Sequence, residues 1–79
     1  MVDEIRQIIK DHGRLPIAVG ELAPDADLYQ AGMTSHASVN VMLALEDAFD
    51  FEFPEKMLKK STFESIYAIR SAVNEMAGG

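Results

Sequence analysis

Residues 34–49 decide the fold, and they read TSHASVNVMLALEDAF. From Ser35 to Phe49 the apolar residues recur at intervals of three and four, which is the spacing of one face of an α-helix. Thr34 or Ser35 supplies the hydroxyl that commonly caps a helix N-terminus. We therefore expect a helix over residues 35–49 with a wide apolar face turned to the core. The apolar residues of this face are Val39, Met42, Leu43, Leu45, Ala48 and Phe49.

The residues before this stretch predict one helix and one long loop. Residues 2–12 carry apolar side chains at helical spacing, and Gly13 follows as a helix stop. Residues 14–33 have no sustained period and are interrupted by two prolines and two glycines. A loop of this length is uncommon in a compact domain and tends to carry function. The residues expected to hold it to the core are Leu15, Val19, Leu22 and Leu28.

The residues after the stretch predict two more helices. Pro54 fits the first turn of a short helix that runs through Met57 and ends near Lys60. Ser61 or Thr62 is expected to cap the last helix, whose apolar residues recur at steps of three and four. The prediction is an all-α bundle of four helices, three long and one short, with a long loop between the first two. It forms a single domain over residues 1–79, with 78–79 as a frayed tail.

Composition narrows the class of protein. The 79 residues are 48% hydrophobic and 25% charged, which is typical of one small globular domain. No apolar run approaches the roughly 20 residues of a membrane span. The acidic N-terminus has no signal-peptide pattern, so the cytoplasm is the expected location. The chain contains no Cys, and therefore has no disulfide and no thiol of its own.

Charge is distributed unevenly along the chain. Thirteen acids and seven bases give a formal net charge of −6, which disfavours nucleic acid as a partner. All the bases lie within residues 6–14 and 56–70, whereas residues 15–55 contain eight acids and no Lys or Arg. A middle segment of one sign would steer a basic partner, although a solvated surface that keeps the protein soluble is the simpler interpretation.

An independent catalytic or metal site is not expected. His12 and His36 lie in different predicted elements, and neither has a close His or Cys partner, so no metal cluster is indicated. Nothing in the pattern brings a Ser-His-Asp triad together, and the adjacent Ser35 and His36 point about 100° apart on a helix. The sequence is therefore interpreted as that of a binding or carrier module rather than an enzyme.

The remaining candidate site is Gly32-Met33-Thr34-Ser35-His36. Backbone N–H groups and the positive end of the dipole favour an anion at a helix N-terminus, so a phosphate attached to Ser35 would be stabilised there. Gly32 would allow the chain to turn tightly before the helix. Taken alone, the pattern favours the simpler interpretation, in which Ser35 only caps the helix.

The surroundings of this serine resemble the acyl carrier protein family. Residues 27–35, DLYQAGMTS, resemble the family's D-L-x-x-x-G-x-D-S, and residues 39–49, VNVMLALEDAF, resemble its V-E-L-V-M-A-L-E-E-E-F helix. Residues 53–55, FPE, and residues 61–63, STF, stand where the family has I-P-D and T-T-V. The pieces keep the family's spacing from residue 27 to the last helix, so the resemblance covers nearly the whole chain.

The resemblance implies a four-helix carrier fold with a 4′-phosphopantetheine arm on Ser35. A phosphopantetheinyl transferase would move the arm from coenzyme A to the Ser35 hydroxyl as a phosphodiester, and cargo would be held on the arm as a thioester. The absence of Cys agrees with this, because the arm brings the thiol. Such a carrier makes no bonds itself, and it presents the arm to partner enzymes as a monomer.

Departures from the family pattern indicate which carrier this is. Residues 34–36, TSH, replace the usual D-S-L, and Ala37, Ser38 and Asn40 stand where fatty-acid carriers expose acids. This surface is more similar to that of stand-alone aminoacyl carrier proteins. Those are loaded by ATP-dependent amino acid:carrier protein ligases that resemble class II aminoacyl-tRNA synthetases. The residues expected to contact such a partner are Thr34, His36, Ala37 and Asn40.

Two alternatives remain open. One is a carrier of acyl chains for fatty-acid or polyketide-type synthesis, in which apolar residues would line a cavity for the chain. A filled core is the commoner outcome for such residues. The other is an interaction module with the carrier fold and an unmodified Ser35. The residues that would line a cavity are Met42, Phe49, Phe51, Phe53, Met57, Phe63, Ile66 and Ile69.

Overall fold

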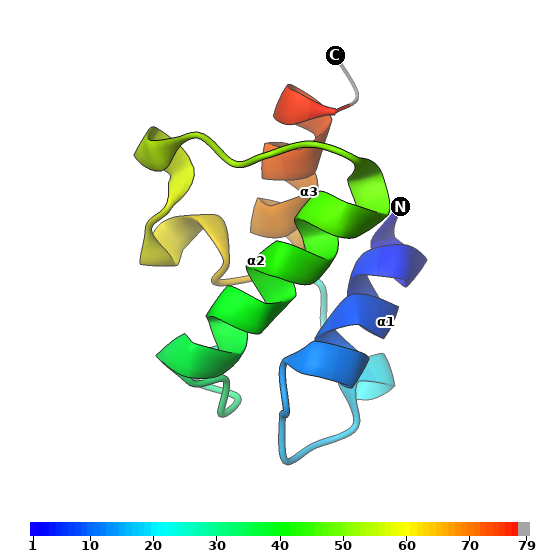
Figure 1. Ribbon diagram of the computed structural model, residues 1–79. Coiled ribbons are helices and arrows are strands. Elements are labelled where there is room, and N and C mark those ends of the chain that lie inside the picture. Colours follow the sequence, from blue (N-terminus) through cyan, green and yellow to red (C-terminus); the bar gives the residue numbers. More distant parts are fainter. Residues whose placement is uncertain (78–79) are drawn as a thin grey trace.

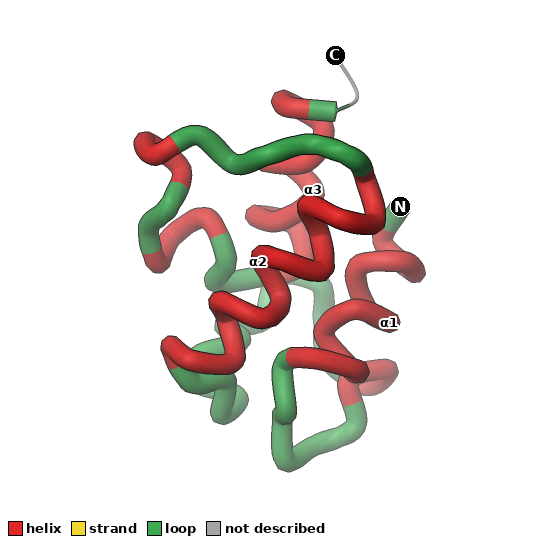
Figure 2. The backbone as a smooth tube through the Cα atoms, viewed as in Figure 1, coloured by secondary structure: helices red, strands yellow, loops and turns green. Residues whose placement is uncertain are grey.

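Three α-helices pack around one core in the computed structural model, which describes residues 1–77 (Figure 1). Short 3₁₀ helices lie in the connections, and no strand forms within the described residues (Figure 2). The all-α class is therefore confirmed, whereas the predicted tail at 78–79 lies outside the described residues. The helices are α1 (Val2–His12), α2 (Ser35–Phe49) and α3 (Ile66–Met76), and the 3₁₀ helices are η1 (Val19–Glu21), η2 (Glu55–Met57) and η3 (Lys60–Thr62).

The predicted bounds of the first two helices are confirmed, but the four-helix count is not. The short helix expected from Pro54 to near Lys60 is replaced by the two separate 3₁₀ turns, η2 and η3. The last helix begins at Ile66 and is capped by Ser65, whose Oγ accepts a hydrogen bond of 3.0 Å from the backbone N–H of Ala68. The prediction that residue 61 or 62 caps this helix is therefore wrong.

The core lies between the helices, because α1 packs against both α2 and α3. In Figure 1, α1 runs beside α2, and α3 lies behind α2. The connection from 50 to 65 covers the flank of the bundle opposite α1. Of the eight residues that would line a cavity for an acyl chain, five are buried and three are half-buried. The largest fully buried side chains are Ile5, Ile9, Leu28, Val41, Leu45, Ile66, Ile69 and Val73.

Helix α2 exposes part of the face that its sequence predicts to be buried. Val39 is 50% exposed and Leu43 is 53% exposed, whereas Ala37 is only 2% exposed. The reason is geometric: Ala37, Val41 and Leu45 are spaced by four and share one side of the helix, and residues two positions away point to the other side. The buried apolar face of α2 is therefore narrower than the sequence predicts.

Hydrogen bonds hold the long loop between α1 and α2 in place. The Arg6 guanidinium Nη1 donates to the carbonyl oxygens of Val19 (2.9 Å) and Leu22 (2.8 Å). The backbone N–H of Leu28 donates to the carbonyl of Glu64 (2.7 Å), which ties the loop to the turn before α3. Val19 and Leu28 are buried as predicted, and Leu22 is half-buried. This loop is therefore fixed at the point where it delivers the chain to α2.

Candidate functional site

The turn before α2 determines where that helix begins. The Asp27 carboxylate oxygen Oδ1 accepts hydrogen bonds from the backbone N–H groups of Tyr29 (2.9 Å) and Gln30 (3.2 Å). Gly32 adopts a φ of +119°, and a Cβ atom at this position would lie 2.7 Å from Pro16 Cδ. Only glycine fits that conformation and that space. The D-L-x-x-x-G part of the motif therefore positions the start of α2.

Thr34, and not Ser35, caps α2. Its Oγ1 accepts a hydrogen bond of 3.0 Å from the backbone N–H of Ala37, and its carbonyl accepts one of 2.9 Å from the N–H of Ser38. Ser35 is the first residue of the helix and is exposed. Its hydroxyl is not needed for capping, so the interpretation of Ser35 as only a helix cap is wrong.

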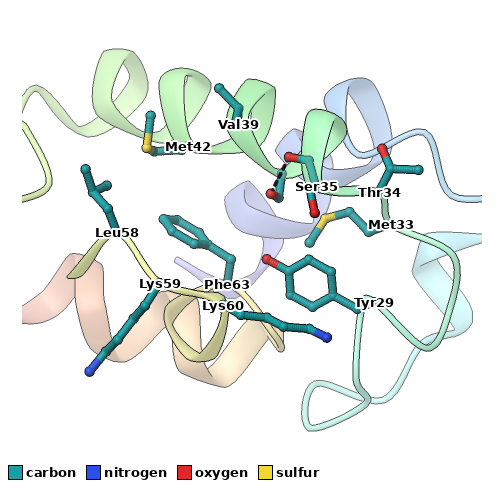
Figure 3. Close-up of a pocket in the computed structure, with 11 residues that line it drawn as sticks. Tyr29, Met33, Thr34, Ser35, Val39, Met42, Leu58, Lys59, Lys60 and Phe63 are labelled. Carbon is teal, nitrogen blue, oxygen red and sulfur yellow. Dashed lines mark hydrogen bonds between the residues drawn. The ribbon is translucent and has the colours of Figure 1, made fainter. Parts of the chain in front are cut away.

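Ser35 lies at one end of a groove of about 680 Å³ (Figure 3). One wall is α2, and the other is the segment 58–63 between η2 and α3. Tyr29 and Met33 lie near Ser35 at one end, and Met42 faces Leu58 at the other (Figure 3). The groove therefore leads from the exposed hydroxyl along the side of α2. Its lining residues are Tyr29, Met33, Thr34, Ser35, Ser38, Val39, Met42, Leu58, Lys59, Lys60 and Phe63.

The groove combines an apolar floor with two cations. Phe63 and Met33 are 5% and 3% exposed. The Lys60 ammonium lies 4.9 Å from the centroid of the Tyr29 ring, a cation–π contact, and its side chain runs beneath that ring (Figure 3). Lys59 also lines the groove. The positive end of the α2 dipole favours an anionic group on Ser35, and the Lys60 ammonium lies beside Tyr29 near that end of the groove, whereas the Lys59 ammonium points away from it (Figure 3).

Three of the four residues predicted to contact a partner reach the protein surface, and one does not. Thr34 lines the groove, and His36 is exposed next to it. Ala37 belongs to the core, so its side chain cannot reach a partner, and that prediction is corrected. Asn40 is half-buried and lies in a second, smaller groove between α1 and α2, which His12 also lines.

Sequence reasoning missed the wall opposite α2. Leu58, Lys59 and Lys60 lie where the sequence predicts a short helix, and the two 3₁₀ turns that replace this helix give the segment a different path. Tyr29 could have been found, because it follows Asp27 by two residues in the turn that positions Ser35. Within residues 1–77, no three His, Cys, Asp or Glu side chains are grouped to hold a metal ion. None of the helices described there is both long and apolar enough to cross a bilayer.

Comparison with known proteins identifies the family. Residues 3–69 match the family described as "Phosphopantetheine attachment site". The chain is 47% identical over 75 residues to the aminoacyl carrier protein of Agrobacterium fabrum, an alignment that covers 95% of this chain and 90% of the relative. Both matches include Ser35, Thr34 and the turn before them.

Solved structures show the same fold. A carrier protein from Agrobacterium tumefaciens, in complex with an engineered Bradyrhizobium japonicum glycine:[carrier protein] ligase and AMP, superposes with a TM-score of 0.92 at 47% identity. That comparison covers 94% of this chain and 99% of the other. A glycylated carrier protein bound to the B. japonicum ligase gives a TM-score of 0.77 at 27% identity, and it covers 90% of this chain and 95% of the other.

The site suits the group that defines this family. A 4′-phosphopantetheine arm needs an accessible hydroxyl, a place for its phosphate charge and room for its chain. Ser35 supplies the hydroxyl, and the N-terminus of α2 suits the charge. The groove gives room for the chain of the arm. The chain therefore belongs to the phosphopantetheine-attachment family and, within it, to the aminoacyl carrier proteins.

Proposed function

We propose that this chain holds an aminoacyl group as a thioester on a 4′-phosphopantetheine arm attached to Ser35. The observation that carries the proposal is the position of Ser35, which is exposed at the start of α2 and relieved of capping by Thr34. It also opens onto the groove. Family membership supports the nature of the arm, and the aminoacyl carrier relative supports the class of cargo.

Attachment replaces the hydroxyl proton of Ser35 with a phosphorus atom. The Ser35 oxygen bonds to the phosphorus that carries the pantetheine end of coenzyme A, and the bond from that phosphorus to the nucleotide phosphate breaks. The nucleotide leaves with the electron pair, and the transferase accepts the proton. The resulting phosphodiester places one negative charge at the N-terminus of α2, where the helix dipole stabilises it.

The chain acts as a carrier and leaves bond formation to its partners. The arm supplies the thiol that a chain without Cys does not have. A phosphopantetheinyl transferase attaches the arm. A separate ATP-dependent amino acid:carrier protein ligase loads it, as the ligase complexes of the two structural relatives suggest. We propose that His36 and Asn40, with Thr34, contribute to the ligase contact.

Intact mass spectrometry tests the attachment. Apo protein is incubated with coenzyme A and a broad-specificity phosphopantetheinyl transferase, with Ser35→Ala alongside. We expect one phosphopantetheine on the parent and none on Ser35→Ala. Ser38→Ala is the matched control, because Ser38 is a second hydroxyl in the same groove and should leave the modification intact. An unchanged modification of Ser35→Ala would refute the assignment.

Loading tests the cargo. The modified protein is incubated with ATP, glycine and the B. japonicum glycine:[carrier protein] ligase, and a mass increase of one glycyl group is expected. His36→Ala and Asn40→Ala should raise the KM for the carrier and leave kcat unchanged. Asn74→Ala, an exposed position on α3, serves as their control. Equal KM values for all three variants would remove His36 and Asn40 from the docking surface.

A further inference from the structure

We propose that Phe63 sets the class of cargo by filling the space beneath the groove, so that the cargo remains at the protein surface. This inference rests on the proposed function, because it concerns the group carried on Ser35. It assigns this carrier to short polar acyl groups, such as aminoacyl groups, and excludes long acyl chains from the interior.

Phe63 occupies the place through which a chain would have to enter the core. It lines the groove that opens at Ser35, yet only 5% of the residue is exposed, so its ring forms the floor (Figure 3). Phe63 belongs to the same core cluster as Leu45 and Ile66, both at 0% exposure, so the interior is already occupied by side chains. An apolar chain could enter only if the Phe63 ring moved.

Other aromatic rings and backbone hydrogen bonds hold the Phe63 ring. Its centroid lies 5.2 Å from that of Phe53, and the centroid of Phe53 lies 4.6 Å from that of Phe51; both pairs meet edge to face. The backbone N–H of Phe53 donates to Glu46 Oε2 (2.8 Å), which fastens this row of rings to α2. The backbone N–H of Phe63 donates to the Lys60 carbonyl (3.1 Å). Displacement of the Phe63 ring would therefore disturb several contacts together.

The sequence of this chain is bulkier here than the family pattern. Phe53 stands where that pattern has Ile, and Phe63 stands where it has Val. Both replacements add ring volume at a point where protein interiors are already closely packed. An aminoacyl group does not need an apolar cavity, and burial of its ammonium would be unfavourable. The two phenylalanines therefore suit a cargo that stays in water.

Thioester accessibility tests this inference. The parent and the Phe53→Ile/Phe63→Val variant are loaded at Ser35 with octanoyl- or acetyl-phosphopantetheine from the corresponding acyl-CoA. The rate at which hydroxylamine cleaves the thioester is then measured by intact mass. This rate is divided by the rate for the free acyl-CoA to give a cleavage ratio. For the parent, both ratios should be close to one. For the variant, the octanoyl ratio should fall about tenfold, since burial of two methylene groups provides that factor. The acetyl ratio should not change.

Controls separate the possible causes. Phe49→Val shortens a half-buried phenylalanine outside the groove and should behave as the parent. If circular dichroism shows that the double variant does not fold, Phe63→Leu replaces it, and a smaller fall in the octanoyl ratio is expected.

Two results overturn the inference. One is an octanoyl thioester that is already protected about tenfold on the parent, and the other is a folded Phe63 variant with no added protection. If no acyl group is added to the parent at all, the proposed function fails as well, and the mass spectrum distinguishes this outcome from the other two.

Discussion

Thr34 and Ser35 divide between them two tasks that one hydroxyl residue could perform. Thr34 satisfies the backbone at the start of α2, which leaves the Ser35 hydroxyl free for the arm that we propose it carries. In the family pattern an aspartate precedes the serine, and a carboxylate is also an effective cap. The departure at Thr34 therefore changes the charge beside Ser35 and keeps the capping function.

Replacement of the cap should weaken the protein measurably. Thr34→Ala removes the acceptor for the N–H of Ala37, and we expect the free energy of unfolding to fall by about 1 kcal/mol. Thr34→Ser keeps the oxygen and should stay near the parent, as should Ser35→Ala. Urea unfolding followed by circular dichroism measures all three. A larger loss for Ser35→Ala than for Thr34→Ala would transfer the capping role to Ser35.

Gly32 supports a second prediction at this scale. Gly32→Ala should lower the free energy of unfolding by about 2 kcal/mol, because alanine is strained at a φ of +119° and its Cβ would collide with Pro16. Gly20→Ala is the matched control, since a Cβ at position 20 meets no atom within 4 Å. The same urea titration applies, and equal stability of the two variants would contradict the strain argument.

At the scale of elements, the end of α2 is as well defined as its beginning. Asp50 adopts the left-handed conformation with a φ of 56°, and its N–H donates to the carbonyl of Glu46. The N–H of Phe51 donates to the same carbonyl (3.1 Å). This turn directs the chain away from α2 and toward the row of phenylalanines.

The left-handed residue leads to a stability prediction for this element. Asp50→Gly should raise the free energy of unfolding by up to about 1 kcal/mol, because glycine adopts the left-handed conformation without steric penalty. Asp50→Val should lower it, since a β-branched side chain is strained there. Thermal unfolding provides the comparison, with Glu52→Gly at an exposed neighbour as the control. A lower melting temperature for Asp50→Gly would contradict the prediction.

The sequence predicts α1 and α2 well because local signals suffice for them. It does not predict the start of α3, where Ser61, Thr62 and Ser65 are all suitable caps and Phe63 also fits the helical period. Contacts distant in sequence decide the matter. The carbonyl of Glu64 accepts from the N–H of Leu28, so the chain at residue 64 is paired with the long loop and cannot join the helix.

The candidate site, too, could be predicted from the sequence only where local signals determine it. Ser35 follows from a local motif, and the structure adds that Thr34 is the cap. The groove could not be predicted, because Tyr29 and Phe63 meet α2 from distant parts of the chain. Ala37 is predicted to contact a partner but is buried in the core. An alanine gives no signal about which side of an apolar helix is covered.

At the scale of the whole molecule, charge is separated along α2. Lysines 59 and 60 lie in the groove with Ser35, whereas the far end of the helix is acidic and surrounds the exposed Leu43. With a net charge of −6, the protein should attract a partner that carries bases. The acids at this end are Glu46, Asp47, Asp50 and Glu52.

Salt should therefore weaken loading. Between about 0.1 and about 1 M NaCl the Debye length falls from about 10 to about 3 Å, and we expect the KM for the carrier to rise severalfold with little change in kcat. Asp47→Asn should raise the KM at low salt more than Glu75→Gln does, since Asp47 belongs to the acidic group at the end of α2, whereas Glu75 lies on α3 beside the basic segment 56–62. Steady-state loading by the ligase measures both effects. A KM independent of salt would identify the acids as a solvated surface only.

The position of Tyr29 also gives this carrier a built-in optical signal. The chain has no Trp and two Tyr, so excitation in the tyrosine band, beyond the absorption of its four Phe, gives emission from Tyr29 and Tyr67. Tyr29 lines the groove with Ser35, whereas Tyr67 lies on α3 beneath the Arg70 guanidinium. Tyr67→Phe leaves one tyrosine, Tyr29, which lines the same groove as the serine that we propose accepts the arm. We expect attachment of the arm, loading and discharge to change this emission, which a fluorimeter would follow continuously without any added dye.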